Sequence, residues 1–209
     1  MAYKIALISP PLRATSRKLP LSLLSLAGYI EKYVPGTEVK LIDIKARPYY
    51  KLKDSEIASI KRKIVEETKK FNPDMVGFTV LFSDVKDTLF LSDEIKKVLP
   101  STVVVAGGVH ASYRPDELLS ENIDYIVIGE GERTFKELVQ SHIINKTLSD
   151  SQKAKIKGLA YLKNKKIIKT GFRSLIPNLD EIPTLPYEKV DLKFYLTPDL
   201  THIYYFLLS

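Results

Sequence analysis

The sequence predicts an α/β domain of three layers, with a parallel sheet of five strands between two layers of helices. Short, almost wholly apolar runs, which are typical of strands buried on both faces, alternate with longer segments of helical periodicity. Five such alternations fill about the first 145 residues. Right-handed crossovers then favour the strand order 2-1-3-4-5 of flavodoxin-like, or Rossmann-like, domains.

Each predicted strand is a short run rich in Val, Ile and Leu. The third run is apolar throughout except for Thr79, and the fourth leads directly into Gly107-Gly108. The predicted strands are Tyr3–Ile8, Val39–Ile44, Met75–Leu81, Thr102–Ala106 and Tyr125–Ile128.

Proline and glycine mark the ends of the predicted helices. Pro20 suits the first turn of the first helix, Pro35-Gly36 ends it, and Asn72-Pro73 ends the second. The fourth prediction is a short helix, and the fifth begins at an acidic residue. The predicted helices are Leu21–Tyr33, Asp54–Phe71, a segment from Ser83 or Asp84 to Leu99, Pro115–Ser120 and Glu132–Ile144.

The pattern changes after residue 145. Ile156–Leu162 and Lys166–Thr170 predict two strands joined by a short turn, and the prolines that follow predict a stiffened linker. The last residues, Thr201–Ser209, form an apolar, aromatic, strand-like run. We therefore expect that the natural polypeptide continues, or that this strand needs a partner.

Composition excludes several classes of site. The 209 residues contain no cysteine, which excludes disulfides, thiolate zinc sites and an iron–sulfur cluster held by these residues. No run approaches the length of a membrane span, and the apolar stretch at the N-terminus is too short for a signal peptide. We expect a cytoplasmic protein without membrane contact.

The net charge of +7 comes from one segment. Residues 151–173 contain seven lysines and Arg173 without an acidic residue, which leaves the rest of the chain at −1. Because no basic face covers the main domain, this distribution argues against nucleic acid as a partner. A solvated surface and a contact with an acidic partner are both open for the segment.

The candidate ligand residues lie in the loops after strands one, three, four and five, which share one edge of the sheet. Ligands of open α/β sheets bind at the carboxyl ends of the strands. Glycines there permit close approach of a ligand, and exposed N–H groups suit a phosphate or a polar tail. The candidates are Ser9, Pro10, Pro11, Thr79, Val80, Ser83, Gly107, Gly108, His110, Gly129, Glu130 and Gly131.

Each feature also has a plain structural explanation. Gly107-Gly108 fits a tight turn without a ligand, and Glu132 fits a residue that complements the dipole of the fifth helix. Thr79 fits a hydroxyl bonded to local backbone, and His110 a hydrogen-bonded loop histidine. The residues alone leave both interpretations open.

The same loops exclude three other ligand classes of this architecture. A phospho-receiver needs acidic residues after strand one, an Asp at the end of strand three and a Lys after strand five, but this chain has Ser9-Pro10-Pro11, Thr79-Val80-Leu81 and Gly129-Glu130 at these places. A flavodoxin needs a Gly-rich phosphate loop after strand one, but residues 9–18 contain no glycine. The dinucleotide fingerprint G-x-G-x-x-G is also absent there.

Taken together, the motifs resemble the cobalamin-binding domains found N-terminal to radical S-adenosylmethionine barrels. The resemblance covers nearly the whole chain, and its paired Gly-Gly-x-His and Gly-Glu-Gly-Glu motifs are its most specific part. The matching segments are Pro10-Pro11, the run 21–29 (LSLLSLAGY), 74–79 (DMVGFT), 106–110 (AGGVH) with Pro115-Asp-Glu, 124–134 (DYIVIGEGERT) and the linker 179–186 (LDEIPTLP).

The resemblance implies cobalamin bound base-off, with its nucleotide tail at the sheet edge and the corrin ring over the rim. Gly107 and Gly108 would leave room for the tail, Thr79, Val80 and Ser83 would flank it, and Gly129–Gly131 would form the other wall. Related domains supply a histidine to cobalt from the loop after strand one, but Pro10–Lys18 contains none. We therefore expect no histidine ligand to cobalt, no metal ligand from this chain, and a polar contact from His110.

The resemblance also implies a division of labour. Residues 1–145 would form the cobalamin-binding domain, and 146–209 a β-hairpin and linker toward a radical S-adenosylmethionine barrel in cis. That barrel would hold the 4Fe-4S cluster and S-adenosylmethionine, and methyl transfer or related radical chemistry would need it. The 209 residues would be inactive alone. The alternative hypothesis is a non-catalytic α/β domain whose lysine-rich hairpin binds an acidic partner.

Overall fold

The computed structural model describes residues 2–10, 19–44, 53–120 and 122–196. The predicted strand-like run Thr201–Ser209 and most of the loop Pro10–Lys18 lie outside the described residues. Among the described helices, none is both long and apolar enough to cross a membrane.

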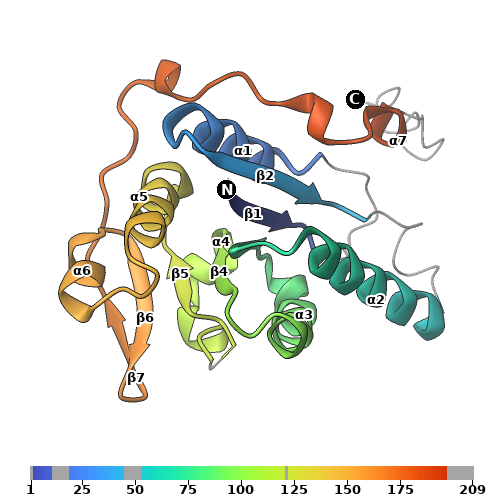
Figure 1. Ribbon diagram of the computed structural model, residues 1–209, viewed down its shortest axis with the longest axis horizontal. Coiled ribbons are helices and arrows are strands. Elements are labelled where there is room, and N and C mark those ends of the chain that lie inside the picture. The colour runs from blue at the N-terminus through green and yellow to red at the C-terminus, as the bar shows by residue number, and fades with distance from the viewer. Residues whose placement is uncertain (1, 11–18, 45–52, 121, 197–209) are drawn as a thin grey trace, which may run out of the picture.

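One sheet of seven strands forms the centre of the molecule, in the order β2-β1-β3-β4-β5-β6-β7 (Figure 1). The first five strands pair in parallel in the order 2-1-3-4-5, so the predicted fold class is confirmed. The strands are β1 (Tyr3–Ile8), β2 (Thr37–Ile42), β3 (Met75–Thr79), β4 (Val103–Gly107), β5 (Tyr125–Val127), β6 (Leu159–Lys163) and β7 (Lys166–Lys169).

Two helices cover each face of the parallel strands (Figure 1). The pair on one face is α1 (Leu21–Tyr33) and α5 (Gly131–Ile144), and the pair on the other is α2 (Asp54–Phe71) and α3 (Val85–Val98). The bounds of α1 and α2 agree with those predicted, because their apolar spacing and their terminating Pro-Gly and Asn-Pro residues all act locally.

Alternating residues of each strand feed two separate cores. Leu7 of β1 packs beneath α1 and α5, whereas its neighbour Ile8 packs beneath α2 and α3. Both side chains are fully buried. This two-sided burial explains why the strands read as continuous apolar runs instead of alternating ones.

The predicted C-terminal hairpin is present as β6 and β7. The hairpin β6–β7 extends the central sheet, since β6 pairs antiparallel with β5. Leu159 and Tyr161 of β6 are buried in the core beneath α1 and α5, and Ala160 in the core on the other face. The division of the chain at residue 145 stays a prediction.

Three short helices also depart from the sequence-based expectation. Residues expected to form a loop make α4 (Val109–Tyr113), and the short helix expected at Pro115–Ser120 is a 3₁₀ turn, η3 (Pro115–Glu117). Helix α6 (Asp150–Lys155) was not predicted; Ser149 caps it by accepting a hydrogen bond from the Gln152 amide. Helices this short depend on caps and tertiary contacts instead of periodicity.

The basic segment found in the sequence forms α6 and the hairpin. Lys166 and Lys169 lie exposed on β7, the last strand of the sheet. Charged side chains on an edge strand oppose pairing with a second chain. The local positive charge therefore has a structural explanation, and contact with an acidic partner is a separate question.

A long connection follows the hairpin. We call residues 171–191 the strap; it contains the 3₁₀ turns η4 (Leu179–Glu181) and η5 (Tyr187–Lys189) and leads to α7 (Leu192–Leu196). In Figure 1 the strap runs from β7 past α5 and over α1. It is the segment that the prolines predicted to be a stiffened linker.

Candidate functional site

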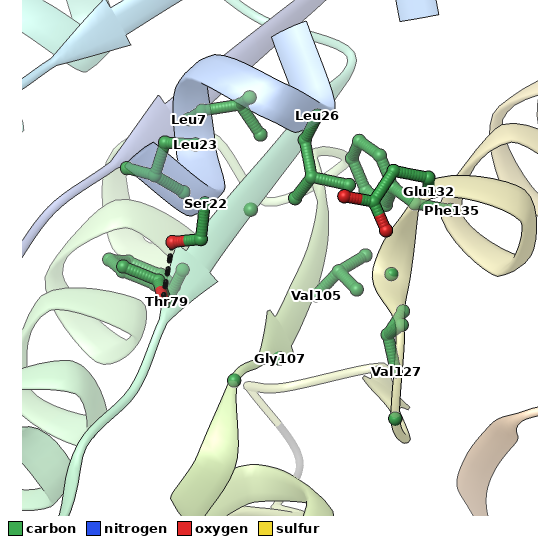
Figure 2. Close-up of a pocket in the computed structure, with 15 residues that line it drawn as sticks. Leu7, Ser22, Leu23, Leu26, Thr79, Val105, Gly107, Val127, Glu132 and Phe135 are labelled. Atoms are coloured by element: carbon green, nitrogen blue, oxygen red, sulfur yellow. Dashed lines mark hydrogen bonds between the residues drawn. The ribbon is translucent and has the colours of Figure 1, made fainter. Parts of the chain in front are cut away.

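A pocket opens between α1 and α5 at the carboxyl edge of the sheet (Figure 2). We call it the α1–α5 pocket, and its volume is about 110 Å³. Its lining is mostly apolar, with hydroxyl and carboxylate groups from α1, β3 and α5. The lining residues are Leu7, Ser22, Leu23, Leu26, Gly77, Phe78, Thr79, Val105, Gly107, Gly108, Val127, Gly129, Gly131, Glu132 and Phe135.

The floor of the pocket comes from the register of the sheet. Leu7 pairs with Gly77, and Gly77 with Val105, so the three residues form one row on one face. A Cβ atom at Gly77 would lie only 2.8 Å from Cδ2 of Leu7. A glycine in a strand interior marks a place where another group approaches the backbone. Here the missing side chain leaves space above the sheet between the side chains of Leu7 and Val105.

Polar contacts join α1 to α5 and to the end of β3 around the pocket. The hydroxyl of Ser25 on α1 donates to Oε1 of Glu132 on α5 at 2.7 Å. At the rim, the hydroxyls of Ser22 and Thr79 lie 3.3 Å apart (Figure 2). Figure 2 also shows Leu26 and Glu132 side by side between the two helices. The pocket thus combines an apolar floor with a few hydrogen-bonding groups, as small-molecule sites do.

The two glycines at the end of β4 have different roles. Gly108 has φ +97°, and a Cβ there would lie 3.0 Å from both the backbone N and O of Val80. Gly108 is therefore required by the fold, because the backbone after β4 passes against β3. Gly107 has no such constraint: its Cβ would make an ordinary contact with Val127 at 3.6 Å.

The other wall begins at Gly129. Its φ is +79°, and no atom of the described residues lies within 4 Å of the position that a Cβ would take, so this part of the wall is open. Gly131, the first residue of α5, approaches α1 closely, since a Cβ there would lie 3.2 Å from Cδ2 of Leu26. The first amides of α5 carry the positive end of a helix dipole, which favours a negatively charged group.

The structure brings together five of the twelve candidate residues. They line the α1–α5 pocket and come from three loops distant in sequence: Thr79, Gly107, Gly108, Gly129 and Gly131. Pro11 lies outside the described residues.

The other six candidates lie around the rim without lining this pocket. Ser9 and Pro10 are buried after β1, and Val80 is buried and bonded through its backbone to Gly107 and His110. Ser83 donates its hydroxyl to Asp84 at 2.8 Å. These contacts are those of a tightly bonded loop.

His110 and Glu130 each have a partner away from the pocket. Nε2 of His110 lies 2.8 Å from Oε2 of Glu117, and the carboxylate of Glu130 accepts a hydrogen bond from the amide of Ile176 at 2.7 Å. His110 borders a second hollow, the rim groove, which has a volume of about 440 Å³. The rim groove is lined by Leu81, Phe82, Val109, His110, Tyr113, Arg114 and Glu117.

Most of the pocket floor and the residues from α1 were not among the candidates found in the sequence. Gly77 carried a signal, since it interrupts an otherwise apolar buried strand. Ser22, Leu26 and Glu132 lie in segments that carry the family resemblance, but nothing in the sequence marked them as pocket residues, because only the packing of α1 against α5 brings them to the edge.

No group of three or more His, Cys, Asp or Glu side chains in the described part of the chain is arranged to hold a metal ion. Neither His110 nor His142 is among the residues that line the α1–α5 pocket. His142 belongs to α5 near its carboxyl end, where its ring packs edge-on against Tyr125 with centroids 5.6 Å apart.

Comparison with known proteins assigns the family. The profile of the B12 binding domain matches residues 14–139, which is more than half of the chain. The chain belongs to the B12-binding domain family. Cobalamin is thus the cofactor of this domain. The matched region contains four of the five parallel strands, β2 to β5, and every lining residue of the α1–α5 pocket except Leu7.

Three curated relatives match at similar identity. An uncharacterized methyltransferase of Pyrococcus horikoshii is 35% identical over 92% of this chain, and a cytidylyl-2-hydroxyethylphosphonate methyltransferase of Streptomyces wedmorensis is 34% identical over 68%. An anaerobic magnesium-protoporphyrin IX monomethyl ester cyclase of Synechocystis is 31% identical over 92%. This chain spans 40, 27 and 37% of the lengths of these relatives, respectively.

Proposed function

We propose that this B12-binding domain holds cobalamin base-off, with the nucleotide tail in the α1–α5 pocket and the corrin ring over the rim. The observation that carries the proposal is the low floor of that pocket at Gly77 and Gly107, directly at the carboxyl edge. An apolar slot between sheet and helices suits a flat aromatic base, and the start of α5 suits the phosphate of the tail.

The size of the pocket sets a condition for this placement. Its volume of about 110 Å³ is below that of a cavity known to admit one benzene ring, roughly 150 Å³. A bicyclic base therefore needs more room than the present side chains leave. Leu26 is a half-buried side chain between the helices, and its rotation would enlarge the slot toward the rim.

The rim supports the placement of the corrin ring. Phe82 and Val109 are 82 and 73% exposed; Phe82 begins the 3₁₀ turn after β3, and Val109 begins α4 after β4. Large apolar side chains this exposed are typical of binding surfaces. Both border the rim groove next to Gly108, where the corrin ring would cover them.

Two observations support binding without a histidine ligand. The loop Pro10–Lys18, where related domains carry that histidine, contains none. His110 is 8% exposed, with Nε2 held by Glu117. We propose that His110 fixes α4 beneath the rim and that cobalt takes no ligand from it.

For the whole protein, we propose a cobalamin-dependent radical S-adenosylmethionine enzyme with methyl transfer as its first candidate reaction. Two of the three relatives are named methyltransferases and the third a cyclase. Bound cobalamin supplies the methyl-carrying or radical chemistry, while the protein binds and orients it. The 4Fe-4S cluster and S-adenosylmethionine would belong to a further domain in cis, which a three-cysteine motif encoded after codon 209 would reveal.

Titration with hydroxocobalamin, followed by visible absorption, tests the site. Gly107→Leu should weaken binding at least tenfold, because the new side chain would extend over Val127 into the pocket. Ser101→Leu is the matched control: it adds the same side chain before the other end of β4, at an exposed position. Gly108→Val is unsuitable, since it would disturb Val80 whether or not a ligand binds.

The spectra and affinities separate the outcomes. Uptake in a base-off form without histidine ligation, and weaker binding only by Gly107→Leu, is the expected result. Histidine-ligated spectra, or equal affinities of the two variants, would overturn the proposed placement. Salt-sensitive binding to a polyanion without corrinoid uptake would instead favour an interaction domain that uses its lysine-rich hairpin.

A further inference from the structure

The strap is bonded to the wall of the α1–α5 pocket that α5 provides. The amide of Ile176 donates to Glu130, beside the glycines of the wall, and Arg133 in the first turn of α5 pairs with Glu181 at 2.6 Å. At the next residue of the helix, Arg173 donates to the hydroxyl of Thr134 at 2.8 Å. The start of α5 is therefore fixed from its outer side.

The same strap is also bonded to the other wall, α1. The phenol of Tyr33 donates to the backbone carbonyl of Glu181 at 2.8 Å. Pro183 and Pro186 pack on Gly28, where a Cβ would lie 3.3 and 3.2 Å from their ring carbons. The prolines noted in the sequence thus fit against a helix position that has no side chain.

Glu181 is a single residue of the strap that contacts both walls of the pocket. Its carboxylate pairs with Arg133 of α5, and its carbonyl accepts from Tyr33 of α1. On the pocket side, Ser25 and Glu132 join the same two helices. The spacing of α1 and α5 is therefore held from both sides, by Glu132 facing the pocket and by Glu181 behind it.

We infer that Glu181 is a positioning residue for the cofactor: through Arg133, the strap sets the spacing of α1 and α5 that admits the nucleotide tail. This inference rests on the proposed function, because the tail must enter that spacing. The pair of Arg133 and Glu181 is partly exposed, and a single such ion pair contributes little to stability. Its effect on binding is larger where it pre-organises the walls of a site, because the ligand then bears less of the ordering cost.

Thermodynamic linkage makes the inference reciprocal. If the strap favours binding of the tail, the bound tail must favour the docked strap by the same factor. Hydroxocobalamin should therefore slow hydrogen exchange of the amides in residues 176–182, although these lie outside the pocket lining. Protection of these amides beyond that of the rest of the chain distinguishes this coupling from general stabilisation of the fold by the ligand.

The test uses the whole chain and the substitution Glu181→Gln, which removes the charge and keeps the backbone bond to Tyr33. We expect hydroxocobalamin to bind about fivefold or more weakly, at a temperature where the variant is folded. We also expect faster exchange of the amides of residues 129–134. Arg133→Gln should weaken binding similarly, and the double variant should be no weaker than the worse single one.

Glu188→Gln is the matched control, since Glu188 is an exposed carboxylate of the same strap. Its affinity for hydroxocobalamin should equal that of the unsubstituted chain. Equal affinities of Glu181→Gln and Glu188→Gln, or no protection of residues 176–182 by the ligand, would overturn the inference while leaving the proposed function intact. Failure of the unsubstituted chain to bind hydroxocobalamin would overturn the proposed function first, and the inference with it.

Discussion

The two edges of the sheet carry hollows of opposite character. The α1–α5 pocket at the carboxyl edge is small, at about 110 Å³, and has an apolar floor. The amino edge carries a larger hollow of about 530 Å³, the amino-edge pocket, with a mostly polar lining. It is lined by Tyr3, Asn72, Pro73, Asp74, Ser101, Thr102, Val103, His142, Lys146 and Thr147.

The polar groups of the amino-edge pocket serve the backbone of the sheet. Oδ2 of Asp74 accepts the amide hydrogen of Lys4 at 2.8 Å, and the hydroxyl of Thr102 donates to the carbonyl of Pro73 at 2.8 Å. These bonds satisfy backbone groups where strands begin. At the carboxyl edge, Gly107, Gly108 and Gly129 place no side chains beside the pocket. The two hollows therefore differ in the chemistry of their lining as well as in volume.

Gly108→Val should give the largest loss of stability among the substitutions considered for the two edges. The valine would adopt a left-handed φ of +97° with its Cβ 3.0 Å from two backbone atoms of Val80. We expect a loss of about 3 kcal/mol in the free energy of unfolding, from strain and displacement together. Chemical denaturation measures it.

Gly129→Val provides the comparison for that loss. Gly129 also has a left-handed φ, +79°, but no atom of the described residues lies near its Cβ position. The free energy of unfolding of Gly129→Val should fall by about 1 kcal/mol, the cost of the φ angle alone. Losses of equal size at the two glycines would mean that contact with Val80 contributes nothing.

Asp74→Ala should have a smaller effect, confined to stability. It leaves the amide of Lys4 without its carboxylate partner at a position that water reaches, so we expect a loss of about 1 kcal/mol. Asp74→Asn keeps an acceptor oxygen and should lose less. Affinity for hydroxocobalamin should stay unchanged in both; a weaker affinity would mean that the two edges are coupled.

The contrast between the edges also marks what the sequence could predict. The strand order and helices α1 and α2 follow from apolar spacing, breakers and the handedness of crossovers, which act within a short stretch of chain. The carboxyl edge could be predicted as the expected ligand edge for the same reason. Of the residues predicted there, Thr79 and Gly107 line the α1–α5 pocket, and their contact with the cofactor stays a prediction.

The rest depends on contacts between residues far apart in the sequence. The hydrogen bond from Ile176 to Glu130 joins residues 46 positions apart in the sequence. No local sequence pattern could therefore predict that the carboxylate of Glu130 points away from the pocket. The pairing of β6 with β5 likewise depends on which sheet edge is open. Gly77 can be recognised as part of the pocket floor only from the register of the sheet, which places it between Leu7 and Val105.

The smallest expected effect is a pH dependence that originates at the amino edge. His142 is 5% exposed, and its Nε2 has no hydrogen-bond partner among the described residues. Burial lowers the pKa of His142 below its ordinary value of 6.5, although a backbone hydrogen bond at Lys146 and the nearby Asp124 act in the opposite direction. As the pH falls below about 6.5, the unfolded chain therefore takes up a proton at this histidine before the folded chain does. The stability that His142 contributes is complete above that pH and is lost as the pH falls toward the lowered value.

His142→Phe isolates this contribution, because phenylalanine keeps an aromatic ring against Tyr125 and cannot be protonated. Its free energy of unfolding should therefore fall less between about pH 7 and about pH 5 than that of the unsubstituted chain. Urea denaturation at both pH values measures the difference. An identical pH dependence in the two proteins would show that His142 is as easily protonated in the folded chain as in the unfolded one, and that burial at the amino edge costs the imidazolium nothing.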